Sequence, residues 1–379
     1  MLRVVRIVIA PDSFKGSLSA AGAADAIADG VARALPAADL VLRPVADGGE
    51  GTVAAAVRAG WAPRTARVTG PDGRPVEATY AVAGAMAVLE LAEAAGLGLL
   101  DRPAPMTATT RGVGELLLAA LDAGARRIVL GLGGSATTDG GAGMLDALGV
   151  RLLDAEGRDV EPGGGGLAAL ARIDTSGLDP RLHECEIVVA TDVDNPLTGP
   201  AGAAAVFAPQ KGATPAEVAL LDAALARYAS ALAHAVGAWV ERVPGAGAAG
   251  GTAAGAMAVL GAQVLSGAGL VCNLVGLDGV LADAALVITG EGSLDEQTLR
   301  GKAPAEVARR ARNADVPCLA LAGVVRVPPD QLAAGGFLAA HALTELEPDP
   351  ARCRAEAAPL LAALAERVII PALSGDAAR

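Results

Sequence analysis

The chain has 379 residues, a length that at roughly 150 residues per domain favours two domains. Its residues are 53% hydrophobic but only 2% aromatic, and 49 of them are glycine, so Ala, Val and Leu must build the core. The formal net charge of -12 argues against nucleic acid or an anionic membrane as a partner, because such ligands bind to basic patches.

Short apolar runs alternate with longer Ala-rich runs along the chain, which is typical of a mostly parallel sheet covered by helices. A hairpin turn at Gly70-Pro-Asp-Gly-Arg-Pro75 interrupts this rhythm. The strands are predicted at residues 4–10, 40–44, 88–91, 128–132, 187–190, 286–289 and 318–322. The helices are predicted at residues 20–34, 51–60, 114–123, 215–236, 303–313 and 355–368.

Two stretches bear on a membrane or a signal sequence. The N-terminal apolar run is short and stops at Pro11-Asp12, which indicates a first strand and not a signal peptide. Residues 243–277 carry no charge and are long enough to cross a bilayer. Because they are mostly Gly and Ala, we expect a buried helix followed by a Gly-rich loop.

Loops rich in Gly, Asp and Ser follow the predicted strands, at the sheet edge where open α/β proteins bind ligands. Residues 10–19 place Lys15 before a helix whose first amides can bind an anion, although a capped turn with a solvated lysine also explains them. Asp47-Gly-Gly-Glu-Gly-Thr52 combines flexible glycines with two carboxylates that can bind a cation or accept a proton. Its alternative is an acidic helix start that complements the helix dipole.

The longest glycine cluster spans residues 131–143, after the strand predicted at 128–132. Gly131, Gly133 and Ala136 fit a loose dinucleotide pattern, as do the glycines at 245–250, but neither match has the full context of that motif. A loop that holds phosphate without dinucleotide specificity fits better.

Two further loops carry acids. Asp192 and Asp194 point the same way in an extended stretch, so they can share a hard cation such as Mg²⁺, and an Asx turn before Pro196 is the alternative. Residues 289–304 repeat the pattern of glycines and acids before a helix, where a plain polar loop is the alternative.

The absences narrow the chemistry. The sequence has no P-loop motif, no H-E-x-x-H and no G-x-S-x-G. Its four cysteines form no CxxC pair, which indicates isolated thiols in a reducing cytosol, so a cytoplasmic protein is expected. The remaining carboxylates, lysines and glycine amides suit phosphoryl transfer, in which positioning and charge neutralisation dominate.

Taken together, these segments resemble the bacterial two-domain glycerate kinase family of the non-P-loop type. The resemblance spans nearly the whole chain, and it departs from the family at Thr138, where Asn is usual, and at Ser293, where a basic residue is common. It rests on Ala10-Pro-Asp-Ser-Phe-Lys-Gly-Ser17, Ala46-Asp-Gly-Gly-Glu-Gly-Thr52, Gly133-Gly-Ser-Ala-Thr137, Asp139-Gly-Gly-Ala-Gly-Met144, Asp192-Val-Asp-Asn-Pro-Leu197, Val206-Phe-Ala-Pro-Gln-Lys-Gly-Ala213, Gly245-Ala-Gly-Ala-Ala-Gly-Gly251, Ile288-Thr-Gly-Glu-Gly292, Asp295, Gln297-Thr298 and Gly301-Lys-Ala-Pro304.

The resemblance implies an ATP-dependent kinase that phosphorylates D-glycerate with Mg²⁺, with 2-phosphoglycerate favoured over 3-phosphoglycerate as product. It also implies an α/β fold of two domains with mostly parallel sheets flanked by helices. Residues 1–72 plus 285–379 would form a discontinuous Rossmann-like domain, and residues 73–284 a second domain inserted in it. ATP and D-glycerate would be the partners, without nucleic acid or membrane, and a homodimer is allowed.

Residue roles follow from the same resemblance. Lys15 would neutralise phosphate or the glycerate carboxylate, and Asp47 or Glu50 would accept the hydroxyl proton; Asp192 completes the expected catalytic set. Glu291 and Asp295 form a second carboxylate pair that could exchange roles with these acids, and the sequence does not rank them. The expected Mg²⁺ ligands are Asp192, Asp194 and Asp295. Substrate or phosphate contacts are expected from Asp12, Ser13, Gly48, Gly49, Gly133, Gly134, Ser135, Lys211, Gly247, Gly250, Gly290, Glu291 and Lys302.

Two other classes stay open at this point. An oxidoreductase would use a glycine-rich loop for a dinucleotide, and would reduce NAD(P) with glycerate without consuming ATP. A non-catalytic sensor would bind a hydroxy acid without ATP turnover, although the carboxylates and lysines argue against it.

Overall fold

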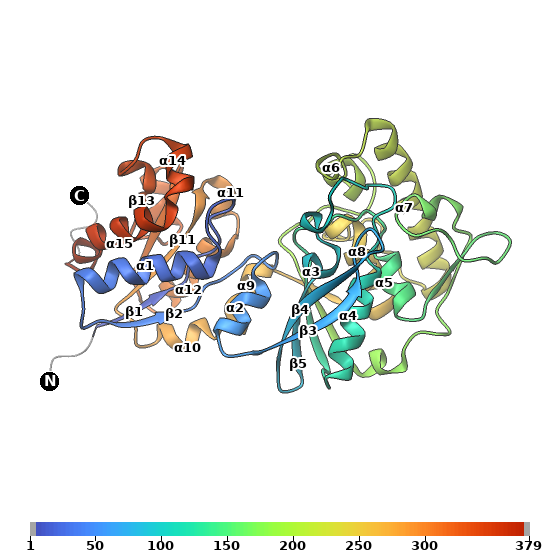
Figure 1. Cartoon of the computed structure of the whole chain (residues 1–379), viewed down its shortest axis with the longest axis horizontal. Coiled ribbons are helices and arrows are strands. Elements are labelled where there is room, and N and C mark those ends of the chain that lie inside the picture. Colours follow the sequence, from blue (N-terminus) through green and yellow to red (C-terminus); the bar gives the residue numbers. More distant parts are fainter. Residues whose placement is uncertain (1–4, 375–379) are drawn as a thin grey trace. The chain divides into compact units, whose positions relative to one another are not determined.

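The structure is a computed structural model that describes residues 5–374, and this part of the chain divides into two compact units (Figure 1). Unit 1 contains residues 5–47, 54–60 and 268–374, and unit 2 contains residues 48–53 and 61–267. The expected domain ranges, 1–72 plus 285–379 and 73–284, stay a prediction, and the compact units begin and end at other residues. The first predicted strand starts at residue 4, which lies outside the described residues.

Unit 1 is built on a five-stranded sheet in which every neighbouring pair is parallel. The strand order is β13-β12-β11-β1-β2, so β1 lies between β11 and β2. The strands are β1 (Arg6–Ile9), β2 (Asp39–Leu42), β11 (Leu286–Leu294), β12 (Cys318–Val325) and β13 (Ala339–Ala342).

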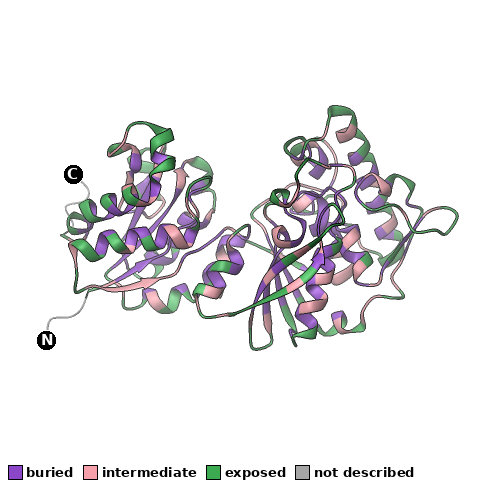
Figure 2. Ribbon diagram, viewed as in Figure 1, coloured by how far each residue is buried: buried purple, intermediate pink, exposed green. Residues whose placement is uncertain are grey.

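Helices cover both faces of this sheet, which explains why β1 is apolar at successive positions. Ile7 and Ile9 point into the cluster formed with α1 and α15, whereas Val8 points into the opposite cluster with α9, α10 and α12. Figure 2 shows the buried strands inside the helices, whose outer faces are exposed. The helices are α1 (Ala20–Ala34), α2 (Thr52–Arg58), α9 (Gly267–Leu274), α10 (Leu277–Leu281), α11 (Glu296–Leu299), α12 (Ala303–Asn313), α13 (Pro329–Ala334), α14 (Pro350–Ala355) and α15 (Ala357–Ser374).

The helices α1 and α15 approach each other very closely. A Cβ at Gly30 would lie 2.0 Å from the carbonyl oxygen of Ala362, so only glycine fits at this crossing. By length and composition, α15 is the one helix within residues 5–374 that could cross a membrane. One face of this helix, which includes Leu361 and Leu364, is buried in the cluster with α1, as in a core helix, whereas Ile370 is exposed.

Unit 2 contains a six-stranded mixed sheet with the order β10-β9-β6-β5-β4-β3. Four strands are parallel, and β4 pairs antiparallel with β3 and β5, which confirms the hairpin predicted at residues 70–75. The strands are β3 (Ala62–Thr69), β4 (Pro75–Ala83), β5 (Met86–Glu90), β6 (Arg127–Gly131), β9 (Glu186–Ala190) and β10 (Gln263–Leu265), with β7 (Arg151–Leu153) and β8 (Arg172–Asp174) forming a separate pair.

The longest helix of unit 2 shows how local sequence sets its ends. It begins with a capping box, in which Thr214 and Glu217 satisfy each other's backbone amides, and with Pro215 in its first turn. It ends at Gly237, whose φ of 73° is left-handed. This helix is α7 (Pro215–Val236), accompanied by α3 (Leu91–Ala95), α4 (Arg111–Asp122), α5 (Ala142–Ala147), α6 (Ala203–Phe207) and α8 (Ala248–Leu260).

The uncharged stretch at 243–277 does not form a single span. It divides into α8, β10 and α9, and most of the first half of α8 is buried in the core of unit 2.

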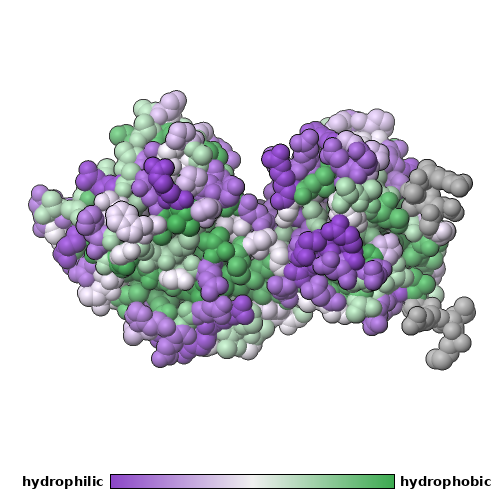
Figure 3. Space-filling model, turned by 180° about the vertical axis from the view of Figure 1, so that it is seen from behind, coloured by the Kyte–Doolittle hydropathy of each residue, from purple (hydrophilic) through white to green (hydrophobic). Residues whose placement is uncertain are grey.

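On the face drawn in Figure 3, hydrophilic residues gather in separate clusters with hydrophobic residues between them.

Candidate active site

Unit 1 contains a cavity of about 310 Å³ at the carboxyl ends of its strands. Loops that follow β1, β2 and β12, together with the end of β11, all reach this edge because the sheet is parallel. Among the expected site residues, the structure brings Asp12, Ser13, Lys15, Asp47, Glu291, Asp295 and Lys302 together there. Two cations that the sequence interpretation did not single out, Arg326 and Arg354, line the same cavity.

Asp12 is the most deeply buried acid of this cavity. Its residue is only 6% exposed, its amide donates to the carbonyl oxygen of Gly290 at 2.8 Å, and its Oδ1 accepts from the Ser13 amide at 2.6 Å. Burial, followed by the nearby Asp47 charge, raises the pKa of Asp12 to about 7. This carboxyl can therefore hold or release a proton near neutral pH.

The other acids of the cavity are engaged locally. Asp47 Oδ2 lies 4.0 Å from Lys15 Nζ, in an ion pair whose lysine is largely exposed. Glu291 accepts a hydrogen bond from the Thr298 hydroxyl at 2.5 Å, and burial raises its pKa. Asp295 accepts from the Gln297 amide at 2.9 Å and caps α11.

The glycine loop after β6 contacts a second glycine loop within unit 2. A Cβ at Gly133 would lie 2.3 Å from Gly49 Cα, and one at Gly131 would lie 2.4 Å from the Gly48 carbonyl oxygen. These positions need glycine because two backbones touch there.

Three successive backbone amides of this loop indicate a site at which an anion can bind. The N–H groups of Gly133, Gly134 and Ser135 have no hydrogen-bond acceptor among residues 5–374. Gly134 has a φ of 74° and is exposed, and Gly133 is half-buried. Successive free amides around a left-handed residue form a concave anion site.

Lys211 is buried under the loop formed by residues 133–135 and is not exposed on its surface. The residue is 2% exposed, and its Nζ donates to Ser135 Oγ at 2.8 Å and to the Thr137 carbonyl oxygen at 2.6 Å. Burial lowers the pKa of this amine to about 8. The structure thus places Lys211 as a support of the loop, and a direct phosphate contact from it stays a prediction.

The expected phosphate glycines at 247 and 250 pack against neighbouring loops of unit 2. A Cβ at Gly247 would lie 2.3 Å from the Pro196 carbonyl oxygen, and one at Gly250 would lie 2.0 Å from that of Thr137. Ala249, Gly250 and Gly251 all have positive φ at the start of α8. Close packing of loops therefore explains these glycines without a ligand.

Asp192 and Asp194 lie on one exposed loop after β9. Asp192 Oδ1 accepts from the hydroxyl of Ser266 and from the amide of Gly267, both at 2.9 Å. The third expected metal ligand, Asp295, belongs to unit 1. Among the described residues, no group of three His, Cys, Asp or Glu side chains could hold a metal ion.

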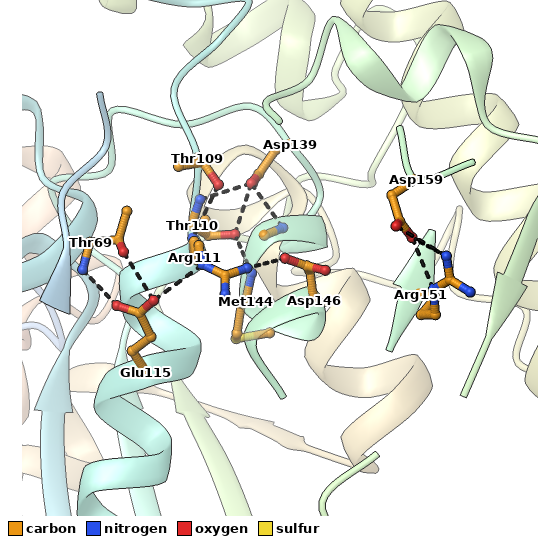
Figure 4. Close-up of polar contacts among 11 residues, drawn as sticks. Thr69, Thr109, Thr110, Arg111, Glu115, Asp139, Met144, Asp146, Arg151 and Asp159 are labelled. Atoms are coloured by element: carbon orange, nitrogen blue, oxygen red, sulfur yellow. Dashed lines mark hydrogen bonds and ion pairs between the residues drawn. The ribbon is translucent and has the colours of Figure 1, made fainter. Parts of the chain in front are cut away.

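Asp139 is a buried acid to which the sequence interpretation gave no role, although it lies in a quoted motif. It is fully buried and accepts hydrogen bonds from the Thr110 amide and hydroxyl at 2.9 and 2.8 Å (Figure 4). The amides of Gly141 and Gly143 also donate to it. This carboxyl ties the loop before α5 to the start of α4, beside the salt-bridged Arg111.

Glu90 is a second acid that sequence reasoning missed. It ends β5, is 3% exposed, and accepts from the amides of Gly51 and Val53 at the start of α2. Burial raises its pKa to about 7. Glu50, an expected proton acceptor, lies exposed on the same loop of unit 2.

Comparison with known proteins gives a consistent result across the chain. Residues 7–372 match the model of the glycerate kinase family. The chain is 50% identical over 326 residues to a glycerate kinase of Bacillus subtilis (strain 168), covering 85% of each chain. It is 49% identical over 324 residues to the glycerate 2-kinase of Escherichia coli (strain K12), covering 84% of this chain and 85% of that one.

The fold is shared with a crystal structure assigned as glycerate kinase 2 from Salmonella typhimurium LT2. That match has a TM-score of 0.86 and 45% identity, and it covers 98% of this chain and 99% of the other. The α/β fold class, the resemblance and the assignment as a glycerate kinase that the sequence predicts are thereby confirmed. The chain belongs to the glycerate kinase family.

Proposed function

We propose that this enzyme transfers the γ-phosphoryl group of ATP to the 2-hydroxyl of D-glycerate. The observation that carries the proposal is its 49% identity, over 84% of the chain, to a protein named glycerate 2-kinase. ATP is the donor that a glycerate kinase implies. The choice of the 2-hydroxyl is the part that needs a product measurement.

The cavity of unit 1 has the size and charges of a small hydroxy-acid site. Its volume of about 310 Å³ is at the lower end for ligand pockets, which are roughly 300–1,000 Å³. Lys302, Arg326 and Arg354 line it and form no ion pair among residues 5–374, so they support binding of a carboxylate. Acids on the same wall offer acceptors for hydroxyl groups.

Two roles within this cavity follow from the family resemblance. Lys15 would neutralise the carboxylate or an incoming phosphate, and its largely exposed side chain leaves the amine able to move. The resemblance implies that Asp47 or Glu50 accepts the hydroxyl proton, and of these two Asp47 lines the cavity.

Unit 2 would supply phosphate contacts through backbone amides. The amides of Gly133, Gly134 and Ser135 support this role because they have no acceptor among the described residues. The loops at Gly48 and Gly247 pack beside neighbouring loops of the same unit and would hold this cradle in shape.

Mg²⁺ is the metal that this reaction would use. In kinases it keeps several waters and is held by one or two carboxylates together with substrate phosphates, not by a protein-only cage. Asp192 and Asp194 on one exposed loop provide such a pair, which fits the absence of a three-ligand group among residues 5–374. Bound there with ATP, the ion would neutralise phosphate charge.

The setting of the enzyme is inferred from sequence. We infer a cytoplasmic enzyme whose partners are ATP and D-glycerate, without nucleic acid or membrane, and a homodimer remains an allowed assembly. Size-exclusion chromatography with light scattering would measure the mass in solution.

One assay tests the activity. ADP release is followed with D-glycerate, L-glycerate, lactate and tartronate, and the product is identified by ³¹P NMR against 2- and 3-phosphoglycerate. Turnover of D-glycerate to 2-phosphoglycerate is expected. Formation of 3-phosphoglycerate would overturn the regiochemistry, and reduction of NAD(P) or binding without ADP release would favour the oxidoreductase or the sensor.

A further inference from the structure

The cavity of unit 1 contains two buried acids, Asp12 and Glu291, and they differ in their contacts. Asp12 is 6% exposed yet lines the cavity. Its Oδ1 accepts from the Ser13 amide at 2.6 Å, and no residue between 5 and 374 donates a hydrogen bond to its Oδ2. A buried carboxylate oxygen with no protein donor, on the wall of a ligand-sized cavity, is placed to meet a polar atom of the ligand.

The neighbouring acids are occupied in other ways. Asp47 forms a 4.0 Å ion pair with the largely exposed Lys15, and its own side chain is 30% exposed. Glu291 accepts from the Thr298 hydroxyl, and Asp295 caps α11. Of the four acids in the cavity, Asp12 is the one that is buried and, among residues 5–374, accepts no hydrogen bond from another side chain, which leaves its Oδ2 for a substrate hydroxyl.

We propose that Asp12 accepts the proton of the substrate hydroxyl during phosphoryl transfer, in place of Asp47 or Glu50. The inference rests on the proposed function. The hydroxyl oxygen forms a bond to the γ-phosphorus while the bond from that phosphorus to the β,γ-bridging oxygen breaks, and its electron pair leaves with ADP. The hydroxyl proton moves to Asp12 Oδ2, and Asp12 later releases it to solvent.

The charges that surround Asp12 agree with this role. Burial, followed by the charge of Asp47, raises the pKa of Asp12 to about 7; the Ser13 amide lowers it, and Glu291 (raising) and Lys15 (lowering) have weaker effects. Asp295, which follows β11, and Lys302, which precedes α12, also line the cavity. A general base is most effective when its pKa lies near the working pH.

The experiment compares Asp12→Asn with Asp47→Asn and Glu50→Gln in the full-length enzyme. Asn keeps the shape of Asp but cannot take a proton, so Asp12→Asn should lower kcat roughly 100-fold or more, within the usual range for a general base. The KM values for D-glycerate and ATP should change less than about threefold, and calorimetry should still detect D-glycerate binding. Asp47→Asn should keep kcat within about tenfold.

The pH profile gives a readout that a structural role would not move. For the wild type, kcat/KM should rise with pH through about 7 and level off above it, because the deprotonated carboxylate is the active form. Asp12→Glu keeps a carboxylate, so its kcat should exceed that of Asp12→Asn. The pH at which its kcat/KM rises should differ from that of the wild type. If Asp12→Asn does not fold, the pH profile of Asp12→Glu still tests the proposal.

The outcomes separate two failures. A wild type that releases no ADP with D-glycerate overturns the proposed function itself. An active wild type combined with a near-normal kcat for Asp12→Asn, or a large loss confined to Asp47→Asn or Glu50→Gln, overturns the role of Asp12 alone. So does a wild-type profile without a limb near pH 7.

Discussion

The buried amine of Lys211 donates to the hydroxyl of Ser135 at 2.8 Å and so fixes a loop from below. The amides of Gly133, Gly134 and Ser135 in that loop have no acceptor among the described residues. The buried lysine therefore supports the loop whose backbone amides we propose to bind phosphate.

Lys211→Met tests this arrangement. The substitution keeps the length of the side chain but leaves Ser135 Oγ and the Thr137 carbonyl oxygen buried without the donor they now have. We expect the free energy of unfolding to fall by about 1–3 kcal/mol, measured by urea unfolding. The KM for ATP should rise more than the KM for D-glycerate.

Lys15→Met is the matched control for stability. The Lys15 side chain is 81% exposed and its ion pair with Asp47 spans 4.0 Å, so its loss should leave the free energy of unfolding nearly unchanged. Equal destabilisation by both variants would contradict the supporting role of Lys211.

Asp139→Asn tests the buried network of Figure 4. Asn would place an NH₂ group among four donors that now share one carboxylate. We expect a loss of about 3 kcal/mol in the free energy of unfolding, because buried donors lose their acceptor. The control is Asp146→Asn, which removes a half-exposed ion pair with Arg111 and should cost under about 1 kcal/mol.

Glu90 predicts how stability depends on pH. Its pKa is about 7 when folded and ordinarily 4.5, so between these values the folded state binds more protons than the unfolded state. The free energy of unfolding therefore falls as pH rises through this window, by at most about 3 kcal/mol for this group. It levels off above pH 7.

Glu90→Gln removes that titration while keeping an acceptor for the Gly51 and Val53 amides. Relative to wild type, the variant should gain stability between pH 5 and pH 8, measured by urea unfolding at each pH. Asp12 and Asp139 titrate in both proteins and cancel in the comparison. Glu77→Gln, at an exposed position of the same unit, is the control and should leave the pH dependence of stability as it is. If the free energy of unfolding changed with pH in parallel for wild type and Glu90→Gln, the effect of Glu90 would be ruled out.

Local sequence predicts the elements that carry their own signals. The helix at 215–236 is found because Thr214, Pro215 and Gly237 mark its ends. The strand β13 is not found, because its sequence AAHA has no β-branched residue and becomes a strand through pairing with β12. Likewise the hairpin turn before Pro75 is predicted, whereas β3, with four exposed residues at its start, is not.

The site divides in the same way. Residues that share one sheet edge, such as Asp12 and Glu291, are predicted because parallel strands bring their carboxyl ends together. Burial is what the sequence does not contain: it distinguishes Asp12 from Asp47 and places Lys211 under a loop. Glu90 shows no motif because its partners at Gly51 and Val53 lie 39 and 37 residues away in sequence.

The two arginines of the unit 1 cavity give the last prediction. Arg326 and Arg354 are exposed, line the cavity and form no ion pair among residues 5–374, so we expect them to hold the carboxylate of the hydroxy acid. A hydrogen bond to a charged group contributes about 1.5–3 kcal/mol, so Arg326→Ala or Arg354→Ala should raise the KM for D-glycerate roughly tenfold or more. The KM for ATP should stay within about twofold in steady-state assays. Arg352→Ala is the control, because Arg352 pairs with Glu347 outside the cavity lining and its loss should leave both constants unchanged. An unchanged KM for D-glycerate in the double variant of Arg326 and Arg354 would place the carboxylate elsewhere, with Lys302 the next residue to substitute.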